Sequence, residues 1–294
     1  VLDPRPTWQT RAETGLRVTW LGHSTLLLEV DGVKVLTDPV FGDRASPLGF
    51  AGPKRFHKTP VRFDELPELD AVLISHDHYD HLCLPTMTEL AKSKVPIVTS
   101  LGVGAHLESW GVAAERITEL DWGDVATVKD LRLTATPAQH FSGRGVGDRN
   151  TTSWASFVLE NGKHRVFFSG DTGLTEEFRD IGQRFGKFDL AMFEVGAFHE
   201  KWGDIHLGPH NALKAWELLG SGTFLPIHWG TFNLALHAWD EPAETLASLV
   251  QERGVPMVTP RLGAPIEPSR VERFDPWWRE VADSSAAKRL VPAT

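Results

Sequence analysis

The sequence predicts an α/β fold in which helices cover layered β-sheets, formed as a single domain over residues 1–294. Three observations support this prediction. Apolar runs with strand character outnumber runs with helical spacing, and the helical runs lie between the strands. Hydrophobic residues make up 41% of the chain and charged residues 23%, a balance typical of a globular protein with a large core. No linker divides the chain into two domains.

Strands and turns dominate the first half of the chain. Residues 1–14 are polar and contain proline, which favours an irregular N-terminal arm. Asp31-Gly32 between two β-rich runs is a hairpin turn signal. Residues 39–60 are rich in Gly, Pro and basic residues, and a loop of this length usually forms a functional rim or lid. The strands predicted here are 16–20, 25–30, 33–37, 71–75, 97–99, 116–119, 125–128 and 131–136.

The second half alternates strands with helices after another long loop, 141–152, that is rich in Gly and Arg. We predict strands at 153–160, 165–169, 190–193 and 223–227. We predict helices at 176–185, 209–219 and 242–252, in addition to an earlier helix at 85–93 that begins with proline. Residues 268–294 form a tail rich in proline and charge, and we expect partial disorder at its end.

Composition excludes several classes of protein. The net charge is −9, with 39 acidic and 30 basic residues, which disfavours nucleic acid as a partner. The one dense basic segment, 53–58, is typical of a solvated loop. Cys83 is the only cysteine, so no disulfide can form within the chain, and a reducing, cytoplasmic location fits. No apolar run approaches the ~20 residues of a transmembrane helix.

Residues 76–81, with the sequence His-Asp-His-Tyr-Asp-His, carry the strongest functional signal. They follow the apolar run 70–74 directly, so a buried strand delivers three histidines to its carboxyl end. Burying several imidazoles and carboxylates without partners would cost several kcal/mol. A metal ion removes this cost because it supplies positive charge and accepts their lone pairs. The pattern therefore predicts a metal site.

Other predicted strands also end in polar side chains that could complete such a site. His140 follows strand 131–136, Asp171 follows strand 165–169, and His228 follows strand 223–227. Glycines beside Asp171 and His228 allow tight turns near a bound ion. Alone, each histidine would usually be a satisfied core residue, and Asp171 a turn or cap residue. Together with the six-residue cluster, they favour metal ligation.

These residues, in this order, resemble the metallo-β-lactamase superfamily, and flanking motifs resemble its N-acyl-phosphatidylethanolamine-hydrolysing phospholipase D family in a bacterial form. The resemblance extends from about residue 20 to about residue 261, and it implies a four-layer αββα sandwich of mixed sheets with helices on the outer faces. The motifs that carry it are Trp20-Leu21-Gly22-His23-Ser24-Thr25, Leu36-Thr37-Asp38-Pro39-Val40-Phe41, Gly52-Pro53-Lys54-Arg55-Phe56, Glu119-Leu120-Asp121-Trp122, Ser169-Gly170-Asp171-Thr172-Gly173, Arg184-Phe185-Gly186-Lys187-Phe188-Asp189-Leu190 and Ile227-His228-Trp229-Gly230-Thr231-Phe232.

The resemblance also implies a binuclear site. One metal would take His76, His78 and His140, and the second would take Asp80, His81 and His228. Asp171 would bridge the two. Neutral imidazoles and carboxylates suit two divalent ions, most simply Zn²⁺, with Fe or Mn as alternatives. Two such ions ~3.5–4 Å apart can hold a hydroxide between them.

Several further residues have weaker signals. Asp77 is not expected to be a ligand; it orients a neighbour or faces solvent. For His23 we favour a role in loop structure, or behind the ligands, over direct ligation. His206 matches a family histidine near the metals, with a substrate-facing role weighed against a simple role at a helix entry. Four aromatic residues flank the predicted site and could line an apolar cleft for a lipid: Phe198, Trp202, Trp229 and Phe232.

The resemblance implies metal-dependent hydrolysis of a phosphodiester, as in a phospholipase D, with N-acyl phospholipids or related phosphodiesters as substrates. The hydroxide would attack phosphorus, Asp80 would take a proton, and His206 would assist the leaving group. A lactone or carboxyl-ester hydrolase of the same fold is the first alternative, and a non-catalytic metal-binding protein is the second. The family also implies a homodimer. The short polar arm before Trp20 favours a cytoplasmic protein, at most peripheral to a membrane.

Overall fold

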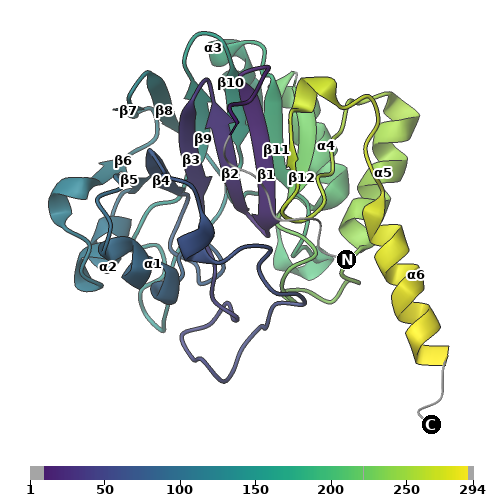
Figure 1. The fold of residues 1–294 in the computed structure, drawn as a ribbon, viewed down its shortest axis with the longest axis horizontal. Helices are drawn as coiled ribbons and strands as arrows, with labels where there is room; N and C mark the ends of the chain where they lie inside the picture. The colour runs from purple at the N-terminus through teal and green to yellow at the C-terminus, as the bar shows by residue number, and fades with distance from the viewer. Residues whose placement is uncertain (1–9, 221, 291–294) are drawn as a thin grey trace.

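The protein is described by a computed structural model that covers residues 10–220 and 222–290 (Figure 1). Thirteen strands of the described residues form two mixed sheets. The first sheet has seven strands in the order β13 (Pro265–Ile266), β1 (Leu16–Gly22), β2 (Thr25–Val30), β3 (Val33–Thr37), β4 (Ala71–Ile74), β5 (Ile97–Ser100) and β6 (Ile117–Leu120). The second has six, in the order β12 (Thr223–Ile227), β11 (Leu190–Glu194), β10 (Arg165–Phe168), β9 (Ser156–Glu160), β8 (Leu131–Thr136) and β7 (Val125–Val128).

Side-chain alternation along the strands builds the layers. In β4, Ala71 and Leu73 belong to the apolar core shared with the second sheet, whereas Val72 and Ile74 belong to a cluster on the opposite face. This period of two buries both faces of the sheet. Met87 of α1 (Leu84–Ala91) and Leu107 of α2 (Val103–Ser109) complete that second cluster.

The outer face of the second sheet is covered by the other helices (Figure 1). α3 (Glu177–Phe185), α4 (Gly208–Leu219) and α5 (Glu241–Arg253) contribute apolar side chains to the core that also contains β10, β11 and β12. The predicted four-layer αββα sandwich of mixed sheets is therefore confirmed. No helix among residues 10–220 and 222–290 has both the length and the apolar character needed to cross a membrane.

The pairing directions bring several strand ends to one edge. β3, β4, β5 and β6 are parallel neighbours, and β1 has the same direction because it pairs antiparallel with β2, which pairs antiparallel with β3. In the second sheet, β10, β11 and β12 are parallel, and β8 shares their direction through β9. Ligand-type residues after these strands therefore leave from equivalent ends, where open α/β sheets place their sites.

The C-terminal tail differs from its prediction. Residues 265–266 form the edge strand β13, and α6 (Trp277–Leu290) follows as a helix. Trp278 is 1% exposed, and its indole N–H donates to Glu244 of α5 at 2.8 Å, so packing against α5 and the Trp20–Trp229 region orders this segment. Partial disorder was predicted for the end of the tail only, and it stays a prediction because residues 291–294 lie outside the described residues.

Smaller differences occur elsewhere. The helix α2 had no strong sequence signal, and the strand predicted at 153–160 begins at Ser156. The loops 39–60 and 141–152 contain no long helix or strand, as predicted, and loop 39–60 extends beyond the carboxyl ends of the first sheet (Figure 1). Of the N-terminal arm, residues 10–14 are irregular as predicted, and residues 1–9 lie outside the described residues.

Candidate metal centre

All seven predicted ligands converge at the shared edge of the two sheets. His76, His78, Asp80 and His81 follow β4, and the remaining three follow strands of the second sheet. The carboxylate of Asp171 is the centre of the arrangement. Imidazole nitrogens of five histidines lie 3.1 to 3.9 Å from its Oδ2: His76, His81, His140, His206 and His228.

The first cluster, which we call the His76 cluster, contains His76, His78, His140 and Asp171. One ligand atom from each lies within 4.8 Å of the others. His76 Nε2 is 2.9 Å from His78 Nδ1, and His140 Nε2 is 3.3 Å from the same atom. The residues predicted to bind one metal are thus within reach of a single ion.

The second cluster, which we call the Asp80 cluster, contains Asp80, His81, His228 and also His23. Their ligand atoms likewise lie within 4.8 Å of one another. Asp80 Oδ2 is 3.2 Å from His228 Nε2 and 3.5 Å from His81 Nε2. Asp171 Oδ2 is 3.1 Å from each of these two nitrogens. Asp171 therefore faces both clusters, which fits its predicted place between two ions.

Hydrogen bonds behind the ligands fix their orientation. Asp38, at the end of β3, accepts from the His81 ring at 2.6 Å and from the Ser75 hydroxyl at 2.6 Å. Ser75 Oγ is in turn 2.9 Å from His76 Nδ1, and His140 Nδ1 donates to the Ile205 carbonyl at 2.8 Å. Such contacts hold a metal-binding imidazole in one tautomer and raise its basicity.

Two buried carboxylates at the site were not among the predicted site residues. Asp38 is 0% exposed, and its position directly after strand 33–37 was the available signal. Glu194, the last residue of β11, is also 0% exposed. Its carboxylate accepts from the Thr172 and Leu207 backbone N–H groups and lies 3.0 Å from His206 Nδ1. The strand end before Glu194 was visible in the sequence, but its partners were not.

His206 lies beside the ligands. Its ring centroid is 5.1 Å from that of His140 and 5.4 Å from that of His228. Because Glu194 holds Nδ1, the other nitrogen of His206 remains to face a bound molecule. Burial alone would lower the pKa of His206, but the Glu194 carboxylate outweighs it and raises that pKa. This placement agrees with a substrate-facing role.

The two clusters differ in electrostatics. Burial and the neighbouring His81 hold the pKa of His76 well below its usual range, and burial lowers the pKa of His140 to about 3. Burial also opposes charge on His228, but the Asp171 carboxylate prevails and raises that pKa to about 10. Asp171 and Asp80 likewise outweigh burial at His81 and raise its pKa well above the usual range. At neutral pH His81 and His228 therefore hold protons that balance the Asp80 and Asp171 carboxylates, whereas burial lowers the pKa of His23, the third imidazole of the Asp80 cluster, to about 3.

The residues present fit a pair of cations. Asp171 Oδ1 and His228 Nδ1 are buried polar atoms without a hydrogen-bond partner among the described residues. Two carboxylates and five imidazoles concentrated in one buried place are costly unless charges pair. Divalent ions would replace the protons on His81 and His228 and pair both carboxylates. The set of nitrogen and oxygen donors suits Zn²⁺, Fe or Mn.

Asp77 points away from the ligands although it stands between two of them. Its carboxylate accepts from the Gly143 N–H at 2.8 Å and from the Thr152 hydroxyl at 3.0 Å. His106 Nε2 lies 3.5 Å from it. Asp77 is 1% exposed, so the solvent-facing alternative is wrong, and the residue instead fastens loop 141–152.

The four flanking aromatic residues have different environments. Trp229 is 4% exposed and stacks on Trp20 at 5.3 Å between ring centroids, so most of it is core. Phe232 and Trp229 nevertheless line a small cavity beside His228. Phe198 stacks on His237, and Trp202 is 38% exposed. The cleft beside His228 is therefore a small one, lined mainly by the segment that follows His228, with Phe56 as its residue from loop 39–60.

Comparison with known proteins identifies the class. Residues 33–229 match the family model described as Beta-lactamase superfamily domain. The isothiocyanate hydrolase from Delia radicum gut bacteria has a similar structure, with a TM-score of 0.69 at 24% sequence identity over 85% of this chain and 98% of that one. This likeness shows the fold. The chain belongs to the metallo-β-lactamase superfamily.

Relatives with higher sequence identity indicate which part of the superfamily the chain resembles. An uncharacterized protein of Mycobacterium tuberculosis is 48% identical over 268 residues, which cover 90% of this chain and 72% of that protein. N-acyl-phosphatidylethanolamine-hydrolyzing phospholipase D 1 of Caenorhabditis elegans is 36% identical over 255 residues, covering 82% of this chain and 72% of that protein. Proteins named as metal-dependent hydrolases are also relatives. With its clustered histidines and carboxylates that could hold a metal ion, the chain belongs with these metal-dependent hydrolases.

Proposed function

We propose that the chain is a binuclear metal-dependent hydrolase that cleaves phosphodiester bonds, as a phospholipase D does, in N-acyl phospholipids or related phosphodiesters. The observation that carries the proposal is the set of five imidazoles around the Asp171 carboxylate, in a chain similar to the Caenorhabditis elegans phospholipase. The ligands are those given above, with His76, His78 and His140 for one ion and Asp80, His81 and His228 for the other.

Two cations bound there would lower the pKa of a water molecule and neutralise charge on the phosphoryl oxygens. The chain's own residues supply the proton transfers. The Asp80 carboxylate, whose pKa the neighbouring imidazoles hold well below its usual range against the effect of burial, is ionised and accepts the proton of the attacking water. The water oxygen bonds to phosphorus as the bond from phosphorus to the leaving oxygen breaks.

In this proposal His206 gives a proton to the leaving oxygen. Glu194 holds its Nδ1 at 3.0 Å and favours the protonated ring, so the second nitrogen can donate. The products would be a phosphoric monoester and an alcohol, with the water proton on Asp80 and the His206 proton on the alcohol. General acid assistance of this kind typically contributes ~10²–10⁴-fold in rate.

The rim of the site supports a lipid substrate. Phe50 is 81% exposed and Phe56 52% exposed, both on loop 39–60, together with the exposed Lys54. This loop pairs with the segment after His228, because the Phe56 N–H donates to the Thr231 carbonyl at 2.8 Å. Exposed aromatic and basic side chains beside a cavity suit an apolar chain with an anionic headgroup. Peripheral contact with a membrane is part of the proposal, and the cytoplasmic location and the homodimer stay predictions.

The test is a substrate panel with metal-loaded protein. Vesicles containing N-acyl-phosphatidylethanolamine, bis-p-nitrophenyl phosphate, an acyl lactone and a carboxyl ester would be compared, with Asp171→Asn as the inactive reference. We expect release of the N-acylethanolamine and a phosphatidic acid. Turnover confined to the lactone or ester would replace the proposal with the alternative hydrolase. No turnover at full metal occupancy would favour a binding protein.

A leaving-group series tests the role of His206. His206→Gln keeps a polar side chain but has no proton to give at neutral pH. We expect the rate to fall about 100-fold for an alkyl leaving group and less than about tenfold for p-nitrophenolate, which leaves without protonation. Equal losses for both leaving groups would contradict the acid role and indicate a structural one.

A further inference from the structure

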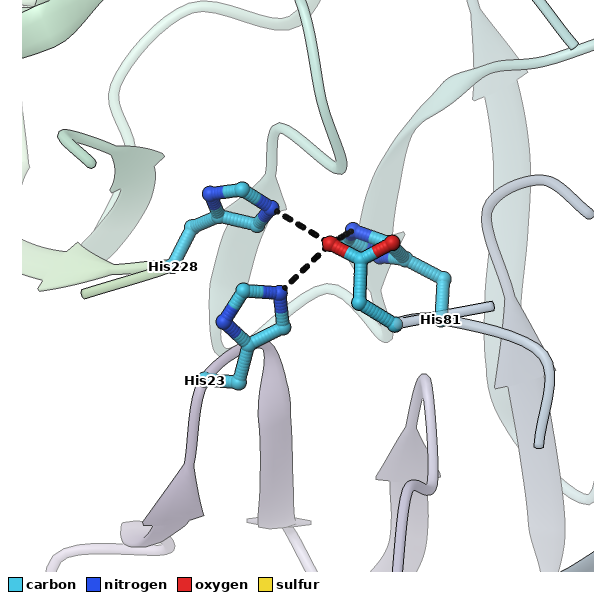
Figure 2. Close-up of side chains that lie close together, drawn as sticks. His23, His81 and His228 are labelled. Atoms are coloured by element: carbon cyan, nitrogen blue, oxygen red, sulfur yellow. Dashed lines mark hydrogen bonds and ion pairs between the residues drawn. The ribbon is translucent and has the colours of Figure 1, made fainter. Parts of the chain in front are cut away.

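His23 was predicted to act in loop structure or behind the ligands, yet its side chain reaches the Asp80 cluster directly. It follows β1, and its side chain is 2% exposed. Figure 2 shows the rings of His23, His81 and His228 directed toward one carboxylate. The Nε2 atoms of the three residues lie 2.9, 3.5 and 3.2 Å from the same oxygen, Asp80 Oδ2. His23 is the nearest of the three.

The backbone holds His23 and His228 as a pair. Both are non-glycine residues with left-handed backbone torsions, φ of 57° and 63°. The His228 N–H donates to the His23 carbonyl at 3.1 Å, and the His23 N–H donates to the Thr231 hydroxyl at 2.7 Å. A non-glycine residue in this region is strained and persists only where its surroundings impose the conformation, often at functional sites. His23 therefore has the same strained backbone conformation as His228, which is a predicted metal ligand.

The backbone of the turn after β1 directs the His23 side chain toward the Asp80 cluster. The pairing of β1 with β2 shifts register between Trp20 and Gly22, and such a bulge redirects the next side chain. Gly22 has a φ of 110°, and a Cβ there would lie 3.2 Å from the Thr231 hydroxyl that anchors His23. The Trp20 indole N–H also donates to the His23 carbonyl at 2.8 Å.

A packing role does not account for an imidazole here. The ring centroid lies 3.9 Å from that of His228 and 5.3 Å from that of Phe232, and neither ring contact requires a ring nitrogen. Instead, Nδ1 of His23 is buried without a hydrogen-bond partner among the described residues. A buried polar atom left unpaired is destabilising, so packing alone would favour an apolar ring at this position. The ring nitrogen that contacts the Asp80 cluster is Nε2, which lies 2.9 Å from Asp80 Oδ2.

We infer that His23 is a further ligand of the cation held by Asp80, His81 and His228. This inference rests on the proposed metal centre and extends its ligand set from seven residues to eight. The four residues have ligand atoms within 4.8 Å of one another, which is compatible with a single ion. With the Asp171 carboxylate between the two ions, this ion would have three imidazoles and two carboxylates, a donor set for Zn²⁺, Fe or Mn.

The direct test is a crystal structure of the wild-type protein loaded with Zn²⁺. We expect His23 Nε2 at about 2.0–2.1 Å from the ion, as for other histidine ligands. If His23 instead remains hydrogen-bonded to Asp80 and lies more than about 3 Å from the ion, the inference is wrong. This measurement needs no variant, so it holds even where a substitution prevents folding.

The second test is His23→Asn, which tolerates the left-handed backbone but is too short to reach the ion. The matched control is His210→Asn, on the exposed face of α4. Elemental analysis and competition with a chelator would measure Zn²⁺ content and affinity. We expect the Zn²⁺ ion at the Asp80 cluster to bind at least about 100-fold more weakly. Loss of a residue that only hydrogen-bonds to a metal ligand typically weakens metal binding by about 10–100-fold. Two ions bound with affinity within threefold of wild type would overturn the inference.

These readouts are independent of the substrate. If the protein binds two ions through His23 but does not hydrolyse a phosphodiester, the proposed function fails and the inference stands. If it hydrolyses the phospholipid and His23 is distant from the ion, the reverse holds. A Co²⁺-loaded sample adds a spectroscopic check, since removing a ligand changes the coordination number and hence the visible spectrum of the Asp80 cluster in His23→Asn but not in His210→Asn.

Discussion

The His76 cluster and the Asp80 cluster have similar side chains, but their histidines differ in protonation state before a cation binds. In the His76 cluster, burial keeps His76 and His140 neutral, with pKa values well below the usual range. In the Asp80 cluster, carboxylates keep His81 and His228 protonated. The first cluster resembles a site ready for metal. The second is an ion-paired network in which a cation must displace protons. The same kind of site can therefore have two different dependences on pH.

The largest effect on metal content and activity is expected from Asp171, which belongs to the His76 cluster and also faces the Asp80 cluster. Asp171→Asn removes the charge from the carboxylate that faces both predicted ions. We expect metal content to fall from two ions to at most one and activity to fall about a thousandfold or more, because the shared anion is lost. Asp180→Asn, on the exposed face of α3, is the control. Two tightly bound ions in Asp171→Asn would show that the clusters do not depend on a common ligand.

The pH dependence of metal binding separates the clusters. His228 has a pKa of about 10, and that of His81 is raised well above 6.5, so both lose a proton when an ion binds near neutral pH. Affinity at the Asp80 cluster should fall about tenfold for each displaced proton as the pH drops by one unit. His140, with a pKa of about 3, is already neutral, so the His76 cluster should change little between pH 8 and pH 6.

Chelator competition at several pH values, with the two ions resolved by stoichiometry, measures this difference. The sign is fixed by proton release: raising the pH strengthens binding at the Asp80 cluster, and lowering it weakens binding there first. Equal slopes at both clusters would mean that the protons on His81 and His228 are not displaced by metal.

A smaller effect is expected from the residues behind the ligands. Asp38 is fully buried and accepts directly from the His81 ring at 2.6 Å, whereas it reaches His76 only indirectly, through the Ser75 hydroxyl. Asp38→Asn should weaken the second ion by about 10–100-fold, the usual range for such a partner, and leave the first ion within about threefold. A loss of both ions would show instead that Asp38, through Ser75 and His76, supports the two clusters together. Metal titration of the purified variant distinguishes these results.

Local sequence predicted most of the site because its residues sit directly after strands. Strand 71–75 delivers a contiguous ligand motif, and the same rule located His140, Asp171 and His228. Contacts that join distant segments could not be predicted this way. Asp38 and His81 are 43 residues apart, and His206 meets Glu194 only because α4 begins beside the end of β11. The position of His23 depends on a bulge and on the Thr231 hydroxyl, 208 residues away.

The same limit explains the errors in the fold. The helix α6 is stabilised by tertiary contacts of Trp277 and Trp278 with Trp229, and its sequence has little amphipathic character of its own. The helix α2 is short and follows Gly102 in a left-handed conformation. Strands with alternating apolar residues were predicted well, because their burial pattern is local.

The smallest effect on metal binding is expected at Asp77, which lies between two ligands of the His76 cluster but points to loop 141–152. Asp77→Ala removes acceptors for the Gly143 N–H and the Thr152 hydroxyl, so we expect a loss of about 1–3 kcal/mol in the free energy of unfolding. Metal affinity should stay within about twofold. Thermal or denaturant unfolding of the metal-free protein, with a parallel metal titration, checks both.

The pH dependence of this stability has a definite sign. Burial would raise the pKa of Asp77, but hydrogen bonds from His106, Gly143 and Thr152 outweigh it and lower the pKa below its ordinary value of 3.8. A lowered pKa means that the ionised group stabilises the fold above about pH 4 and that this contribution is lost as the pH falls through 3.8 and below. The difference between wild type and Asp77→Ala should therefore shrink in acid. If Asp77→Ala keeps its stability but loses a metal ion, Asp77 is itself a ligand. The separation of residues 76–81 into metal ligands and a residue that holds loop 141–152 would then be wrong.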